Sequence, residues 1–246
     1  MSAQLQNNSL LDAALAFVFP PVCQLCNEAR ANAAEGYVCQ DCYKQVRFVR
    51  EPMCKRCGLP FEGSITGLFE CSNCREVELH FSSARSAVLA KDAVLEVIHR
   101  YKYYRSLWFE PFLADLLARA AREELRKEEW DVIVPVPLHP TKLREREFNQ
   151  AERLAQRLGN ALEMPVQTRW LRRTAATRTQ TLLSRNERAA NVRKAFVTAR
   201  GLKLNGERIV LIDDVLTTGA TTNACAKALR DAGAGQVCVW TVARGI

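Results

Sequence analysis

The sequence predicts an α/β fold built on a parallel β-sheet, with a separate cysteine-rich module ahead of it. Three observations lead to this fold class. Four Cys-x-x-Cys pairs crowd into residues 23–74, strand-like and helix-like segments alternate from about residue 81 onward, and one strand-like run ends in two adjacent aspartates. Strands that alternate with helices are typical of βαβ units, in which the strands are parallel. We therefore expect an apolar N-terminal helix (residues 1–20), a cysteine module (21–79) and an α/β domain (80–246).

Apolar spacing predicts the elements of the α/β domain. Residues 84–90 are strand-like, and residues 92–104 and 109–128 have the pattern of amphipathic helices. A strand then leads into a proline-rich turn (131–140), a helix follows (149–162), and residues 236–243 are strand-like. The segment 101–106 is expected to be a helix end with its tyrosines in the core, and a ligand contact is the alternative. Residues 169–188 have no clear period and are expected to form a loop or hood.

The run Ile209–Ile212 is mostly β-branched and continuously apolar, which indicates a strand buried on both faces. Asp213 and Asp214 come next, at the carboxyl end of the strand, which is the edge where open α/β sheets bind ligands. After a loop of small and hydroxyl residues, residues 223–233 have helical composition and end at a glycine. The predicted order is strand, acidic pair, loop and helix.

This order suits a phosphorylated sugar. A loop that feeds a helix start offers unpaired backbone N–H groups and the positive end of the helix dipole to a phosphate. The two carboxylates would accept hydrogen bonds from sugar hydroxyls or help to hold a cation. The loop candidates are Thr217, Thr218, Gly219, Ala220 and Thr221. An ordinary strand–turn–helix is one alternative, and a P-loop is another, although its Gly-Lys-Ser/Thr ending is missing.

Eight of the ten cysteines form the four pairs. Two thiolates separated by two intervening residues on a tight turn can both reach one tetrahedral Zn²⁺, and two such turns complete a site. The spacing therefore predicts a double zinc ribbon with two structural Zn²⁺ ions, in which the pairing can be sequential or interleaved. Disulfides, an iron–sulfur cluster and redox catalysis are the alternatives. The candidate ligands are Cys23, Cys26, Cys39, Cys42, Cys54, Cys57, Cys71 and Cys74, whereas Cys225 and Cys238 are expected in the core.

The formal net charge of +8 is concentrated in one window, because residues 131–200 hold 14 Lys and Arg against 6 Asp and Glu. Such clustering favours phosphate-rich partners, either nucleic acid or a diphosphate, although a solvated basic face is an alternative. Aromatic residues are sparse in this basic set, which argues against a base-stacking platform within it. The candidate phosphate-binding residues are Lys142, Arg144, Arg146, Arg172, Arg173, Arg178 and Arg188.

The apolar segment 10–23 is too short to cross a bilayer, for which about 20 residues are needed. Residues 1–11 carry no Lys or Arg, so the segment lacks the positive start of a signal peptide. We expect a cytoplasmic protein without a membrane span.

The run 210-VLIDDVLTTGATT-222 resembles the phosphoribosyl-pyrophosphate (PRPP) signature of type I phosphoribosyltransferases. The resemblance implies a phosphoribosyltransferase-like sheet that binds PRPP with Mg²⁺. It also implies that Asp213 and Asp214 hold the ribose hydroxyls, while the loop from Thr217 to Thr221 cradles the 5′-phosphate.

A cysteine ribbon block before such a domain resembles the ComF family, including its GntX-type members. Residues 134–151 and 174–196 carry further likeness, at Phe148, Asn149, Gln150, Gln180, Leu183, Arg188, Asn191 and Phe196. The family commonly has Arg-Gly-Phe-Asn-Gln where this chain has Glu147 in place of the glycine. That side chain adds a negative charge beside the expected pyrophosphate turn.

The resemblance implies a role in DNA uptake and use during natural transformation, with single-stranded DNA and proteins of the uptake machinery as partners. A second hypothesis is an active phosphoribosyltransferase that uses Mg²⁺–PRPP and a nitrogenous acceptor, with residues 169–188 closing over the site. A third is a non-catalytic zinc-ribbon adaptor. The sequence assigns no catalytic residue and no acceptor.

Overall fold

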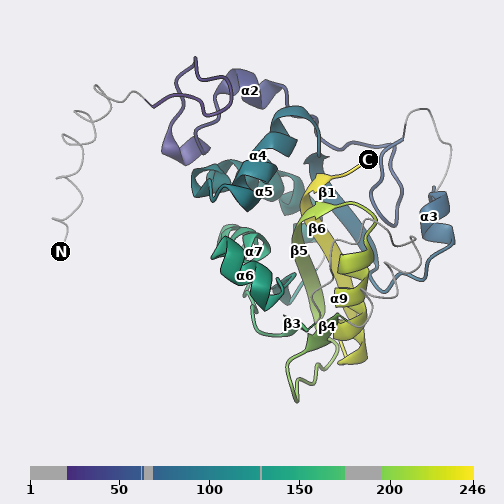
Figure 1. Ribbon diagram of the computed structural model, residues 1–246. Helices are drawn as coiled ribbons and strands as arrows, with labels where there is room; N and C mark the ends of the chain where they lie inside the picture. Colours follow the sequence, from purple (N-terminus) through teal and green to yellow (C-terminus); the bar gives the residue numbers. More distant parts are fainter. Residues whose placement is uncertain (1–20, 62, 64–68, 128, 175–194) are drawn as a thin grey trace, which may run out of the picture.

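The computed structural model describes residues 21–61, 63, 69–127, 129–174 and 195–246 (Figure 1). The expected N-terminal helix (1–20) and the candidates Arg178 and Arg188 lie outside these residues. The described part contains a four-stranded parallel sheet in the order β1-β6-β5-β2. Its strands are β1 (Ser83–Leu89), β2 (Val132–Pro135), β5 (Arg208–Leu216) and β6 (Gln236–Arg244). The predicted parallel α/β fold is confirmed.

Helices cover both faces of this sheet (Figure 1). One face packs against α4 (Asp92–Tyr103), the 3-10 helix η2 (Leu107–Phe109), α5 (Glu110–Lys127) and α7 (Gln150–Leu162). The other packs against α9 (Ala220–Asp231) and a small antiparallel sheet of β3 (Leu171–Arg173) and β4 (Phe196–Thr198). Val210 and Ile212 belong to the first core, whereas Ile209 and Leu211 belong to the second. All four side chains are fully buried, so β5 is covered on both faces as predicted.

Several boundaries differ from the prediction. Strand β5 continues past Ile212 to Leu216, because β6 supplies ladder partners along that whole length. Asp213 and Asp214 therefore lie inside the strand rather than after it. Helix α9 begins three residues earlier than predicted, since Gly219 adopts a left-handed N-cap with a φ of 77°.

The sequence analysis was also wrong about three short segments. The proline-rich turn contains helix α6 (Pro140–Arg146), in which Pro140 takes the first helical position, where no N–H is needed. Part of the expected 169–188 loop is strand β3, whose partner β4 is distant in the sequence. The tyrosines of 101–106 do not all lie in the core, because Tyr101 is fully buried whereas Tyr103 and Tyr104 are exposed.

The cysteine module contains η1 (Ala33–Glu35), α2 (Gln40–Lys44) and α3 (Ser72–Arg75). It covers the open edge of β1. Leu89 N donates to Arg47 O (2.8 Å), Val49 N donates to Ala87 O (3.0 Å), and Ala84 N donates to Arg56 O (2.7 Å). These bonds satisfy backbone groups that an exposed edge strand would leave open to pairing with another chain.

Candidate sugar-phosphate site and zinc centres

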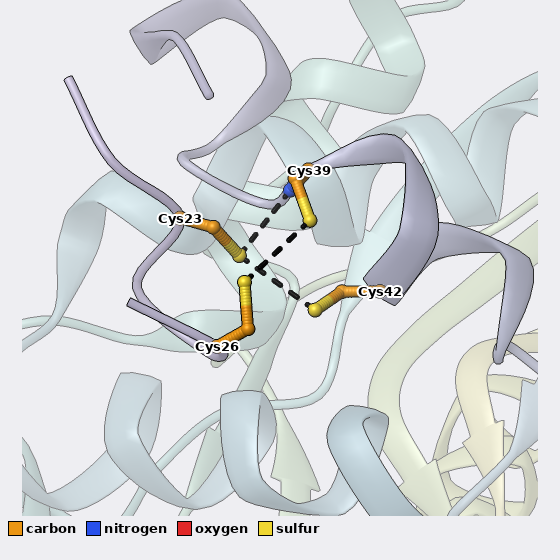
Figure 2. A group of neighbouring side chains, drawn as sticks. All are labelled: Cys23, Cys26, Cys39 and Cys42. Atoms are coloured by element: carbon orange, nitrogen blue, oxygen red, sulfur yellow. Dashed lines mark hydrogen bonds between the residues drawn. The ribbon is translucent and has the colours of Figure 1, made fainter. Parts of the chain in front are cut away.

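Each half of the cysteine module gathers four thiols, from residues 23–42 and from residues 54–74. Figure 2 shows the first group. In the first group the Cys23–Cys42 and Cys26–Cys39 sulfur distances are 3.7 and 3.8 Å. In the second group Cys54–Cys74 and Cys57–Cys71 are 3.8 and 3.6 Å. A tetrahedral Zn²⁺ with Zn–S bonds of about 2.3 Å places its sulfurs about 3.8 Å apart, whereas a disulfide needs about 2.05 Å. Both groups fit Zn²⁺, and the pairing is sequential.

Backbone N–H groups favour the thiolate form that a metal needs. Leu25 N and Cys39 N donate to Cys23 Sγ (3.5 and 3.3 Å), and Cys71 N donates to Cys54 Sγ (3.4 Å). Burial raises the pKa of the Cys23 thiol, but these backbone hydrogen bonds lower it to about 6. Burial also raises the pKa of the Cys54 thiol, and backbone hydrogen bonds lower it to about 7. The two remaining cysteines, Cys225 and Cys238, are buried in the core as expected.

Asp213 and Asp214 lie near the carboxyl end of β5, just before the loop that leads into α9. Asp214 is buried, and its carboxylate forms an ion pair with Lys102 of α4. Asp213 Oδ1 accepts a hydrogen bond from Asp214 N (2.9 Å). Burial raises the pKa of Asp213 to about 6, although nearby Lys102, Arg173 and Arg146 oppose this rise. Near neutral pH most Asp213 side chains are therefore ionised.

The hydroxyl-rich loop joins β5 to the N-terminus of the twelve-residue helix α9. Thr217 and Thr218 are exposed, whereas the next three residues are half-buried. Buried Arg244 fixes the start of the loop, because its Nη1 donates to Leu216 O and Gly245 O, each at 2.7 Å. Thr222 Oγ1 donates to Gly219 O (3.0 Å), which fixes its other end.

Three cationic side chains act on Asp213, namely Lys102, Arg146 and Arg173, and Lys142 lies close enough to act on these cations. We call the four residues the cation cluster: Lys102, Lys142, Arg146 and Arg173. Burial lowers the pKa of Lys102 to about 8, Asp213 opposes this, and Arg146 and Lys142 lower it further. Burial also lowers the pKa of Lys142, together with Arg173 and Arg146. Partly buried like charges repel one another, so the cluster favours an anionic ligand.

Only part of the predicted basic set belongs to this cluster. Lys142 and Arg146 lie one helical turn apart on α6 and are half-buried, whereas Arg144 between them is exposed. On β3, Arg173 faces the site and its neighbour Arg172 is exposed, since successive strand residues point to opposite faces.

Lys102 was missed as a candidate by the sequence analysis. The helical spacing could have identified it. Lys102 lies four residues after Ile98 and eight after Val94, so it falls on the apolar stripe of α4.

The comparisons with known proteins agree with these features. A double zinc ribbon domain model matches residues 14–77. Over 225 residues the chain is 31% identical to Competence protein F of Haemophilus influenzae, which covers 89% of this chain and 96% of that protein. The chain belongs to the ComF family. Another ComF-family relative, the DNA utilization protein YhgH of Escherichia coli K12, is 31% identical over 228 residues, with 92% and 97% covered. Competence protein ComFC of Streptococcus pneumoniae is 28% identical over 206 residues, with 78% and 87% covered.

Solved phosphoribosyltransferases overlap part of the ComF-family chain. Glutamine PRPP amidotransferase from B. subtilis, complexed with ADP and GMP, is 26% identical, has a TM-score of 0.34, and covers 52% of this chain and 24% of its own. Adenine phosphoribosyltransferase from Leishmania tarentolae is 16% identical, has a TM-score of 0.35, and covers 56% and 58%. These overlaps cover only about half of this chain, and they do not identify an activity. In the part of the chain that the structure describes, helices are too short or too polar to cross a bilayer.

The resemblance to the ComF family led us to expect a glycine where Glu147 stands, and the backbone explains why glycine suits the position. Glu147 is the C-cap of α6 and has a φ of 67°, in the left-handed region that glycine adopts without strain. Its carboxylate pairs with Arg105 Nη1 at 2.9 Å, and its side chain is 63% exposed. The added negative charge is thus matched by a surface arginine outside the cation cluster.

Proposed function

We propose that this ComF-family protein binds PRPP at the edge of the sheet beside β5 and assists DNA uptake or utilisation with single-stranded DNA. One observation carries the first half of the proposal. The acidic pair, the loop at the start of α9 and the cation cluster meet around Asp213, although they come from five separate elements. PRPP would offer its ribose hydroxyls to the acidic pair, its 5′-phosphate to the loop and its diphosphate to the cation cluster.

Each group would have a separate task in binding. Asp213 and Asp214 would accept hydrogen bonds from the ribose hydroxyls, which requires Lys102 to share or release Asp214. The loop Thr217–Thr221 would hold the 5′-phosphate at the positive end of α9. The cluster residues Lys142, Arg146 and Arg173 would face the diphosphate.

Magnesium fits the same donor set. Mg²⁺ takes oxygen ligands and is usually held by one or two carboxylates together with substrate phosphates. Asp213 would supply a carboxylate oxygen, the diphosphate would supply further oxygens, and water would complete the ligand set. When bound, the ion would neutralise part of the diphosphate charge.

The DNA half of the proposal is supported by family membership and charge. The relatives are named for competence and DNA utilization, and the excess of basic residues in 131–200 suits a phosphate backbone. We place the protein in the cytoplasm, where it would meet incoming single strands and other proteins of the uptake machinery.

Calorimetric titration of the zinc-loaded protein with Mg²⁺–PRPP tests the sugar-phosphate site. The variant Asp213→Asn/Asp214→Asn should lose at least about tenfold in affinity, because amides accept hydrogen bonds from hydroxyls less strongly than carboxylates. Asp231→Asn, at the far end of α9, is the matched control and should bind as the wild type does. Unchanged affinity in the double variant would place PRPP elsewhere.

The same preparation separates the rival functions. Pyrophosphate release on addition of a nucleobase would identify an active phosphoribosyltransferase. Failure to bind either PRPP or single-stranded oligonucleotides at low salt would leave the zinc-ribbon adaptor as the remaining hypothesis.

A further inference from the structure

Three aromatic rings gather at the C-terminal end of α4. Tyr103 is 60% exposed and Tyr104 is 68% exposed. The His99 ring centroid lies 4.8 Å from that of Tyr103 and 5.6 Å from that of Tyr104. We call these residues the aromatic platform: His99, Tyr103 and Tyr104. Such large rings lose contact with solvent in most folded proteins, so an exposed group of them indicates a surface that meets a partner.

The aromatic platform adjoins the cation cluster. The guanidinium of Arg146 lies over the Tyr103 ring, 4.9 Å from its centroid. The charge of Arg146 also lowers the pKa of Asp213. Lys102, the residue before Tyr103, pairs with Asp214. Arg105 follows Tyr104 and is 53% exposed in its side chain. Rings and cations thus alternate along one short segment that borders the sugar-phosphate site.

The backbone of this segment is held by hydrogen bonds. Tyr104 N and Ser106 N both donate to Arg100 O (2.9 and 3.3 Å), and Leu107 N donates to Arg105 O (2.7 Å). Buried Tyr101, one residue before Lys102, anchors the same turn by donating its hydroxyl to Glu110 Oε2 (3.2 Å). The rings are therefore presented on an ordered support, which reduces the entropy lost on binding.

We propose that the aromatic platform stacks the bases of single-stranded DNA, whose phosphates contact Arg105 and Arg146. Exposed aromatic rings beside cations are the combination that proteins use for single strands, since every base has a face to stack and every phosphate has a charge to neutralise. A duplex keeps its base faces covered, and a purely apolar protein partner would make no use of the charge of Arg105 and Arg146. This inference rests on the proposed DNA function and locates the contact.

The platform lies outside the basic window that the sequence analysis considered. The basic window 131–200 is poor in aromatic residues, which argued against base stacking. The rings come instead from α4, outside that window, and the fold brings Arg146 of α6 onto Tyr103.

Fluorescence anisotropy with two labelled strands tests the platform on the zinc-loaded full chain. One strand is oligothymidine and the other is an abasic strand of equal length, which keeps the phosphates and lacks the bases. The wild type should bind oligothymidine more tightly. Tyr103→Ala/Tyr104→Ala should lose at least about fivefold, and about 30-fold if each ring stacks one base, while its affinity for the abasic strand stays unchanged. Tyr103→Phe/Tyr104→Phe keeps both rings and should bind as the wild type does.

Each result decides between the proposals. If the wild type binds neither strand, the DNA function and the platform fail together. If the wild type binds DNA and the alanine variant binds oligothymidine equally well, the platform alone is refuted and its rings are left for a protein partner. An equal loss toward the abasic strand would also refute stacking. Unchanged zinc content and an unchanged midpoint of urea unfolding show that the alanine variant remains folded.

Discussion

Lys102 of α4 forms an ion pair with Asp214 of β5, and the two side chains are 18% and 7% exposed. A carboxylate this deeply buried requires a partner, because transfer of an unpaired charge from water into protein is costly. The pair therefore couples the last turn of α4, which carries the aromatic platform, to the proposed sugar site.

Removal of Lys102 should destabilise the protein. Lys102→Met leaves Asp214 buried without its cation, and we expect a loss of about 3 kcal/mol in the free energy of unfolding. The double variant Lys102→Met/Asp214→Asn should recover part of that loss. Urea unfolding at pH 7 measures both. Lys227→Met breaks the exposed Lys227–Asp231 pair and should cost less than about 1 kcal/mol. A Lys102→Met cost no larger than this control would show that the buried pair contributes little.

Asp213 should make stability depend on pH. Its pKa is raised from 3.8 to about 6 by burial, so the folded state favours the protonated carboxyl. This contribution is fully present below pH 3.8 and is lost as the pH rises through 6. Asp213→Asn should therefore match the wild type near pH 3.5 and exceed its stability at pH 8 by about 3 kcal/mol. Chemical unfolding of both proteins at several pH values measures the difference, and a difference independent of pH would contradict the raised pKa.

Each of the two cysteine clusters should hold its zinc ion independently of the other. Cys74→Ala removes one ligand from the second cluster and should reduce bound zinc from two to one per chain. The second half of the module should then unfold locally, since structural zinc contributes about 10–16 kcal/mol to such folds. Cys225→Ala, on the buried face of α9, should keep both ions. Elemental analysis of reduced protein measures the ratio, and loss of both ions in Cys74→Ala would show that the clusters depend on each other.

Glu147→Gly should be neutral or mildly stabilising. Glycine relieves the left-handed strain at the C-cap of α6, a gain of about 1 kcal/mol, and loses an exposed ion pair that contributes up to about the same amount. Glu163→Gly, at the left-handed C-cap of α7, is the matched comparison. Thermal unfolding of the two variants gives the result. A loss of more than about 1 kcal/mol in Glu147→Gly alone would mean that the Arg105–Glu147 pair holds the turn in place.

The sequence alone determined the features that depend on local spacing. Thiols three positions apart on a turn can reach one metal ion, so the four cysteine pairs predicted both zinc centres. The continuous apolar run from Ile209 to Ile212 predicted a strand buried on both faces, which the structure confirms. The ligand site at the acidic pair and the threonine loop that follow stays a prediction.

Only the tertiary structure decided which side chains meet. Arg146 and Arg173 join Lys102 around Asp213 while Arg144 and Arg172 remain exposed, because the rotation of each helix and strand against the sheet selects one face of it. The same rotation buries Tyr101 and leaves Tyr103 and Tyr104 in solvent. Local periodicity fixes which residues share a face of an element, but packing between elements distant in the sequence fixes where that face points.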